Sequence, residues 1–272
     1  MSDEVKHWGI RYRAHSGVRL WAVVVAPVQY GPGNPSPPLP LVVSPHGRGV
    51  RGRTNAKMWG NLPGRGDFAV VCPGGMGRRL PLHSWGFKGQ IDDLARMPTI
   101  VGAERPWLRI DPDRVYAVGG SMGGQETLLL VGRHPRLLAG AVAFDSVTDF
   151  FRRYGDFALL GRKGTALQAL ARIEVGGTPA THEHAYRERS PARWIDEIAD
   201  SGVPLQVWWS DADEIVTGQE NQSGKFFGDL RARNPLGRLE KVTGSWSHTA
   251  ESYRRLQLPG AVQWLGLVPE DV

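Results

Sequence analysis

The sequence predicts an α/β fold with a mostly parallel central sheet, helices on both faces, an antiparallel N-terminal edge and an insertion after the sixth strand. Short apolar β-type runs alternate with helix-like segments along most of the chain, an order that favours parallel strands covered by helices. The first two strands are joined by the short turn His15-Ser16-Gly17, as expected of an antiparallel edge. A glycine cluster over 119–124 separates a strand from a helix. This is the sequence expected at a sharp strand-to-helix turn.

The individual elements follow from apolar runs and from the residues that bound them. Strands are expected over 7–13, 18–28, 41–43, 68–72, 115–118, 138–144, 204–209 and 239–242, and helices over 90–103, 125–133, 191–199, 220–233 and 257–265. Pro98 predicts a kink or break in the first helix, and Asp111-Pro112-Asp113 predicts a turn before the fifth strand. Proline and glycine exclude regular structure from 30–40, and 51–66 is polar and glycine-rich.

The chain is predicted to form a single domain over 1–272. Its least regular part, 147–203, is expected to be an insertion or cap region within that domain. The segment holds several aromatic residues and a Gly176-Gly177-Thr178-Pro179 break. We see neither an internal repeat nor a domain linker in the sequence.

Charge and composition argue against several classes of partner. The net charge is +6, from 33 basic and 27 acidic residues, but no block of five basic residues occurs. A solvated arginine-rich surface is therefore favoured over a nucleic-acid site. Cys72 is the sole cysteine, which excludes an intramolecular disulfide and fits a reducing compartment. No signal peptide and no apolar stretch of membrane-spanning length are visible. We expect a cytoplasmic protein without a membrane partner, although a secreted chain trimmed of its leader would look the same.

The residues Gly119-Gly120-Ser121-Met122-Gly123 fit the pattern G-x-S-x-G. In this nucleophile elbow a strained turn presents a serine hydroxyl above the sheet, and a Cβ at the flanking glycines would clash with the strand and helix. The pattern alone is common. Here it lies between a predicted strand and a predicted helix, as the elbow requires.

A serine nucleophile needs a base, and that base needs a carboxylate to orient it. After an elbow serine the acid and then the histidine should follow in chain order. Asp213 comes four residues after the end of one predicted strand, and His248 follows the last predicted strand. Asp145, at the end of an earlier strand, and Asp211 are the competing candidates for the acid.

On these motifs the chain resembles the α/β-hydrolase superfamily, in its esterase and prolyl-oligopeptidase-like branches. The resemblance rests on Gly-Gly-Ser-Met-Gly-Gly at the elbow, Ser-Asp-Ala-Asp-Glu-Ile-Val in the acid loop and Gly-Ser-Trp-Ser-His in the base loop. It extends from about residue 18 to the C-terminus and is weakest over 147–203. It implies the α/β-hydrolase fold, with Ser121 as nucleophile, Asp213 as acid and His248 as general base.

The resemblance also implies an oxyanion hole made of two backbone amides. One is the amide of Met122, which follows the nucleophile. The other should come from the loop His46-Gly47-Arg48-Gly49, which is similar to the family's HGGG-type loop but carries arginine in place of a glycine. We assign it to the Arg48 amide and expect His46 to brace this loop. The Arg48 side chain is expected either to point to solvent or to reach a substrate carboxylate.

Aromatic residues flank the predicted catalytic loops, and the chain holds ten tryptophans. Trp85, Trp209, Trp246 and Phe150 are candidates to contact an apolar or aryl substrate, with core packing as the alternative. His182 and His184 flank Glu183, but a bare H-E-H without further ligands is typical of solvated surface. No metal and no cofactor is predicted.

The function expected is a serine esterase, a carboxylic ester hydrolase that works through an acyl-enzyme on a small-molecule or polymeric ester. Short-chain, aryl, feruloyl-type and polyester substrates all fit. The alternatives are a prolyl-oligopeptidase-like peptidase or amidase, and an acyltransferase. Such peptidases generally carry an N-terminal propeller or gating domain, and 272 residues leave no room for one, which favours esters. A binding module without catalysis, on the same fold, is the remaining alternative.

Overall fold

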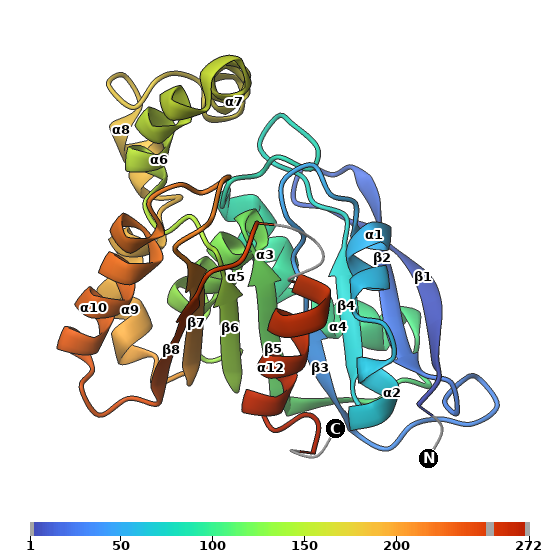
Figure 1. Cartoon of the computed structure of the whole chain (residues 1–272). Coiled ribbons are helices and arrows are strands. Elements are labelled where there is room, and N and C mark those ends of the chain that lie inside the picture. The colour runs from blue at the N-terminus through green and yellow to red at the C-terminus, as the bar shows by residue number, and fades with distance from the viewer. Residues whose placement is uncertain (1–2, 249–252, 270–272) are drawn as a thin grey trace.

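The computed structural model describes residues 3–248 and 253–269 and contains an eight-stranded sheet (Figure 1). The strand order is β1-β2-β4-β3-β5-β6-β7-β8. β1 pairs antiparallel with β2, β2 pairs antiparallel with β4, and all further neighbours are parallel. The predicted fold class is confirmed, including the antiparallel edge. The strands are β1 (Val5–Arg13), β2 (Arg19–Pro27), β3 (Leu39–Val43), β4 (Ala69–Pro73), β5 (Ile110–Gly120), β6 (Gly140–Phe144), β7 (Leu205–Ser210) and β8 (Leu239–Gly244).

Helices cover both faces of the sheet because alternate strand residues point to opposite sides. In β7, Leu205, Val207 and Trp209 enter one apolar core, and Trp208 enters the other. The first core is closed by α3 (Lys88–Ala95), α4 (Met97–Glu104), α5 (Met122–Arg133), α9 (Ile195–Asp200) and α10 (Ser223–Arg233). The second is closed by α1 (Gly52–Met58), α2 (Leu62–Gly66) and α12 (Leu258–Trp264), which a π-helical turn over Tyr253–Gln257 precedes.

Three local predictions need correction or refinement. The helix expected over 90–103 is broken at Arg96, and Pro98 lies in the first turn of α4, where a missing amide hydrogen costs nothing. The polar, glycine-rich segment 51–66, for which we predicted no element, forms α1 and α2. Asp111-Pro112-Asp113 lies inside β5, not before it, at a register shift opposite β3. The turn-forming residues there make a bulge in the strand, since the Asp113 amide donates to Asp111 Oδ1.

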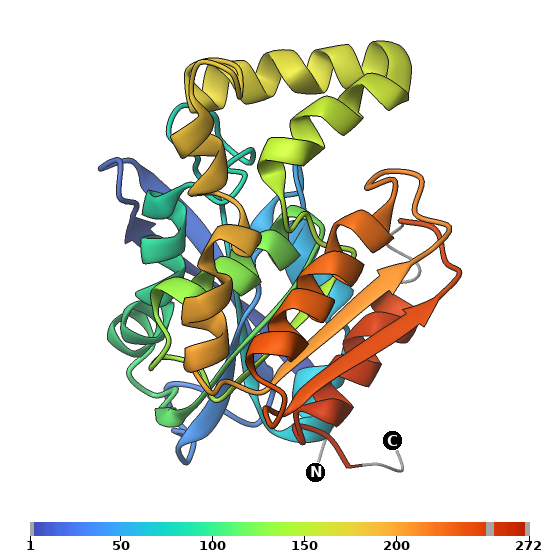
Figure 2. The same ribbon diagram turned by 90° about the vertical axis from the view of Figure 1, so that its left-hand side faces the viewer.

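The insertion after β6 is mostly helical, so its description as the least regular part of the chain was wrong. It contains α6 (Phe150–Asp156), a 3₁₀ turn over Phe157–Leu160, α7 (Gly161–Val175) and α8 (Glu183–Arg187), and a second 3₁₀ turn over Pro191–Trp194 leads into α9. Gly176 ends α7 with φ +111°, which confirms the predicted break. Figure 2 shows α6 and α7 projecting as an arm beyond the strand ends where the elbow lies.

The two ends of this arm meet. The Ala192 amide donates to Thr148 O at 2.9 Å, and the Phe150 amide donates to Ser190 Oγ at 2.8 Å. Farther out, the buried Glu174 carboxylate accepts the backbone amides of residues 78, 79 and 80 at 2.5–2.9 Å. The arm is therefore attached at its base and at the end of α7.

Within the residues that the structure describes, no helix combines the length and the apolar character needed to cross a bilayer.

Candidate active site

Ser121 lies at the turn between β5 and α5 in a strained backbone conformation, with φ 59° and ψ −123°. Its amide donates to Phe144 O at 2.8 Å, which ties the turn to the end of β6. A Cβ added at Gly119 would lie 2.5 Å from Gly123 O, and one at Gly123 would lie 2.3 Å from Pro45 O. Only glycine fits at both positions, as the elbow pattern predicts.

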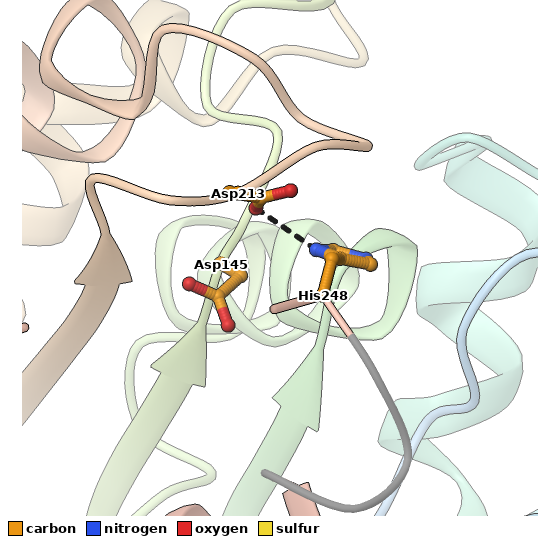
Figure 3. A group of neighbouring side chains, drawn as sticks. All are labelled: Asp145, Asp213 and His248. Atoms are coloured by element: carbon orange, nitrogen blue, oxygen red, sulfur yellow. Dashed lines mark hydrogen bonds and ion pairs between the residues drawn. The ribbon is translucent and has the colours of Figure 1, made fainter. Parts of the chain in front are cut away.

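Asp213 and His248 form a hydrogen-bonded pair, with 2.9 Å between Asp213 Oδ2 and His248 Nδ1 (Figure 3). The Asp213 carboxylate is buried and also accepts the Ile215 amide at 2.9 Å, the Val216 amide at 2.8 Å and Gln219 Nε2 at 3.0 Å. Burial alone would raise the pKa of Asp213, but the hydrogen bond and charge of His248 and the other donors outweigh it and lower that pKa. Asp213 is thus held ionised against the histidine.

Asp145, the competing acid, lies beside this pair but its oxygens are directed elsewhere (Figure 3). Oδ1 accepts the Ser210 amide at 3.0 Å, and Oδ2 accepts Trp246 Nε1 at 2.9 Å and Gln257 Nε2 at 2.7 Å. Burial raises the pKa of Asp145. Of the two carboxylates, Asp213 is the one hydrogen-bonded to His248.

Asp211 is exposed and accepts the Ser245 hydroxyl at 2.5 Å, so it takes no part in the pair. Ligand atoms of Asp145, Asp213 and His248 lie within 4.8 Å of one another, the spacing of a possible cation site. The carboxylate lone pairs that would bind a cation here already accept hydrogen bonds, which fits a proton-transfer site better than a metal site. His182 and His184 are exposed and belong to no such group among the described residues.

A cavity of about 280 Å³ joins the elbow to the histidine. Ser121 and His248 both line it, together with the loop after β3, the end of β6 and the C-terminal π-helical turn. The full lining consists of Gly47, Arg48, Val50, Asn55, Met58, Gly120, Ser121, Phe144, Asp145, Ile215, His248, Tyr253 and Gln257. The structure therefore brings the sequence-predicted serine and the Asp213–His248 pair to one cavity.

Two backbone amides near the serine are available to a ligand. Met122 is the first residue of α5, where an amide has no intrahelical acceptor. The Arg48 amide lies in the loop after β3, and neither amide has an acceptor within 3–248 and 253–269. His46 braces this loop: its Nδ1 donates to Gly47 O, and its Nε2 accepts the Gly75 amide, both at 2.8 Å. Burial lowers the pKa of His46, so the ring stays neutral.

The four aromatic residues predicted to contact substrate do not line the cavity. Trp85 and Phe150 are buried and stacked on each other, with ring centroids 5.6 Å apart. Trp209 points into the core because of its position in β7 and donates to Glu220 Oε1 at 2.7 Å. Trp246 donates to Asp145 instead. Core packing, the alternative interpretation, describes Trp85, Phe150 and Trp209, and Trp246 positions a site carboxylate.

Sequence reasoning missed Gln219, Gln257 and Tyr253. Gln219 orients Asp213, Gln257 binds Asp145, and Tyr253 lines the cavity against Gly120. No motif marks either glutamine. The two C-terminal residues reach the site only because the chain returns across the sheet before α12.

The helix that follows the elbow contains a buried carboxyl group. Glu126 is fully buried in α5, four residues after Met122. Its Oε1 accepts the Ser84 hydroxyl, and its Oε2 has no partner among the described residues. Burial raises the pKa of Glu126 to about 8, so the folded protein carries this side chain as a neutral acid near neutral pH.

Glu126 should make stability depend on pH. Between its ordinary pKa of 4.5 and about 8, the folded chain keeps a proton that the unfolded chain releases. The contribution of protonated Glu126 to the free energy of unfolding is therefore fully present below pH 4.5 and is lost as the pH rises to about 8. Relative to Glu126→Gln, the wild type should lose on the order of 4 kcal/mol of unfolding free energy between pH 5 and 8. Urea unfolding of both proteins at several pH values measures this, and parallel pH curves would contradict it.

Comparisons with known proteins identify the family and the fold of the chain. Residues 88–255, more than half of the chain, match the prolyl oligopeptidase family, Peptidase_S9. Among solved structures, S-formylglutathione hydrolase (FrmB) from Staphylococcus aureus has a TM-score of 0.69 at 16% identity, over 96% of this chain and 99% of that one. A fungal esterase from Rhizomucor miehei has 0.69 at 14%, over 97% and 83%. Porphyromonas gingivalis dipeptidyl peptidase 4 has 0.70 at 17%, over 96% and 35%.

These structural similarities show the fold, and this chain spans about a third of the length of the dipeptidyl peptidase. No curated protein matches the sequence. The chain belongs to the prolyl oligopeptidase family and is a serine hydrolase with the α/β-hydrolase fold.

Proposed function

We propose that the protein hydrolyses carboxylic esters through an acyl-enzyme formed on Ser121. The observation that carries the proposal is the 2.9 Å contact between Asp213 and His248 at a cavity that His248 lines together with Ser121. A serine hydroxyl becomes a useful nucleophile only when such a base accepts its proton during attack.

Each residue then has a defined task. Ser121 Oγ attacks the ester carbonyl carbon while His248 Nε2 takes the hydroxyl proton. Asp213 holds the proton on Nδ1 and stabilises the imidazolium. The amides of Met122 and Arg48 hold the oxyanion of the tetrahedral intermediate. When that intermediate collapses, the C–O bond to the alcohol breaks and His248 gives the alcohol its proton. Water repeats the sequence on the acyl-enzyme and releases the acid.

Two lines support an ester over an amide. The chain matches the hydrolase FrmB and the fungal esterase over most of their lengths, but only part of the dipeptidyl peptidase. Esters are also intrinsically more reactive toward a serine nucleophile than amides, because an ester oxygen donates less electron density to the carbonyl than an amide nitrogen does. Family membership favours peptide or amide hydrolysis as the second candidate. Acyl transfer would use the same site with an alcohol in place of water.

Paired substrates distinguish these activities. We expect steady hydrolysis of short-chain 4-nitrophenyl esters and at least a hundredfold lower kcat/KM on the 4-nitroanilide with the same acyl group. We also expect stoichiometric labelling of Ser121 by a fluorophosphonate, located by peptide mass spectrometry. Faster cleavage of the anilide would make the protein an amidase. If the protein shows no turnover of either substrate and no fluorophosphonate labelling, the proposed enzymatic function is wrong.

A further inference from the structure

The cavity wall contains a guanidinium group that has no counter-charge among the described residues. Arg48 lines the cavity beside Ser121 and is half-buried. Within 3–248 and 253–269 its side chain takes part in no hydrogen bond or ion pair. Burial lowers the pKa of Arg48, and no carboxylate of the described residues offsets this effect. Arginines at such depth normally pair with a carboxylate, because desolvating an unpaired charge is costly.

Among the described residues, the acidic groups at and beside the cavity already have partners. Asp145 accepts three hydrogen bonds, from Ser210, Trp246 and Gln257. Asp213 is saturated by His248, Gln219 and two backbone amides. Glu214 is exposed and accepts the His248 amide at 3.1 Å. None of these carboxylates pairs with Arg48.

A second guanidinium adds positive charge behind the same wall. Arg153 of α6 is 2% exposed and donates through Nη2 to the carbonyl of Ile215, a cavity residue. Its Nη1 is buried without a partner among the described residues. Asp156 and Asp213 favour its charge, yet Arg48 is close enough to oppose it by like-charge repulsion. Positive charge on this part of the cavity wall favours a ligand of negative charge there.

We propose that the enzyme takes esters that carry a carboxylate, with the Arg48 guanidinium as its partner. This inference rests on the proposed ester hydrolysis and names the substrate class of that site. A planar guanidinium binds a carboxylate through two parallel hydrogen bonds. An anion from the substrate would supply the counter-charge that the described residues do not give to Arg48. The oxyanion amide of the same residue belongs to the backbone and persists when the side chain is changed.

The test compares charged and neutral esters of matched size. One pair places the carboxylate in the acyl part: the 4-nitrophenyl monoester of hexanedioic acid against 4-nitrophenyl hexanoate. The other places it in the leaving group: 3-acetoxybenzoate against its methyl ester. We expect the wild type to prefer the charged member of at least one pair by about tenfold in kcat/KM, and Arg48→Met to bring that ratio to about one. Any loss common to both members cancels in the ratio.

Arg51→Met is the matched control, because it removes the same charge from an exposed arginine on the same loop that does not line this cavity. The ratio should stay at its wild-type value in this variant. A wild type that prefers the neutral member of both pairs, or an unchanged ratio in Arg48→Met, overturns the proposal.

Calorimetry without turnover separates this proposal from the proposed function. Hexanedioate should bind Ser121→Ala and bind at least tenfold more weakly when Arg48→Met is added. If the wild type cleaves no ester but hexanedioate binding to Ser121→Ala depends on Arg48, ester hydrolysis is contradicted and the anion site remains supported. If the wild type hydrolyses esters but hexanedioate does not bind in an Arg48-dependent way, the anion site is contradicted and ester hydrolysis remains supported.

Discussion

Replacing Ser121 with alanine is expected to reduce kcat for 4-nitrophenyl acetate by about 10⁶-fold, the scale found when a triad serine is removed. The Asp213–His248 pair and both oxyanion amides remain in this variant, but no atom can form the acyl-enzyme. Alanine shares the positive-φ cost that serine already bears at φ 59°, so stability should change by less than about 1 kcal/mol.

The measurement is burst and steady-state kinetics, with thermal unfolding to show that the variant is folded. A kcat within tenfold of the wild-type value would mean that another group is the nucleophile. If the variant loses both activity and its fold, the kinetics do not identify the nucleophile, and the fluorophosphonate labelling of the wild type then decides whether Ser121 is that residue.

Replacing Asp213 with asparagine should reduce kcat by about 10⁴-fold, because the amide can donate to His248 and so favours the wrong tautomer. The matched variant is Asp145→Asn, which changes the neighbouring carboxylate in the same way. Asp145 does not hydrogen-bond His248, and its partners are Ser210, Trp246 and Gln257. We expect Asp145→Asn to lower kcat by less than about a hundredfold and mainly to destabilise the fold, since donor amides would then face a donor.

Kinetics of both variants across pH 5–9 decide between the carboxylates. A larger loss in Asp145→Asn than in Asp213→Asn would make Asp145 the acid. Similar losses in both would indicate that the two carboxylates orient His248 jointly.

The order of residues along the chain predicted the core of this site. Parallel strands end at one edge of the sheet, so residues just beyond different strands meet there even when they are far apart in sequence. Ser121 follows β5, Asp213 follows β7 and His248 follows β8. Gly119 and Gly123 of the elbow were equally predictable, because a Cβ at either position would collide with backbone atoms.

The sequence contained more helical signal than we used in the insertion. Leu167, Ala171 and Val175 recur every four residues along α7 and are buried, which is the spacing of one helix face. Aromatic residues and glycines around them obscured that pattern. The glycine-rich segment that forms α1 and α2 gave no helical signal, and Gly64 is required there because it lies against the backbone of residue 3, where a Cβ would not fit.

Other features depend on three-dimensional packing and have no local signature. Whether Trp209 faces a cavity or a core is decided by strand alternation and by which helix covers that face. That Asp145 is bound by Gln257 could not be predicted, because 112 residues separate them.

The arm between β6 and β7 leaves and rejoins the body at one place, where the Ala192 amide meets Thr148 O. A segment whose ends touch can be swapped as a cassette without altering the sheet register or the spacing of Ser121, Asp213 and His248. Two sets of contacts with the body constrain such an exchange. The Glu174 carboxylate accepts the amides of 78–80, and Arg153 donates to the Ile215 carbonyl. Chimeras that keep both sets of contacts should fold. The arm could then vary in sequence without changing the residues that carry out the reaction.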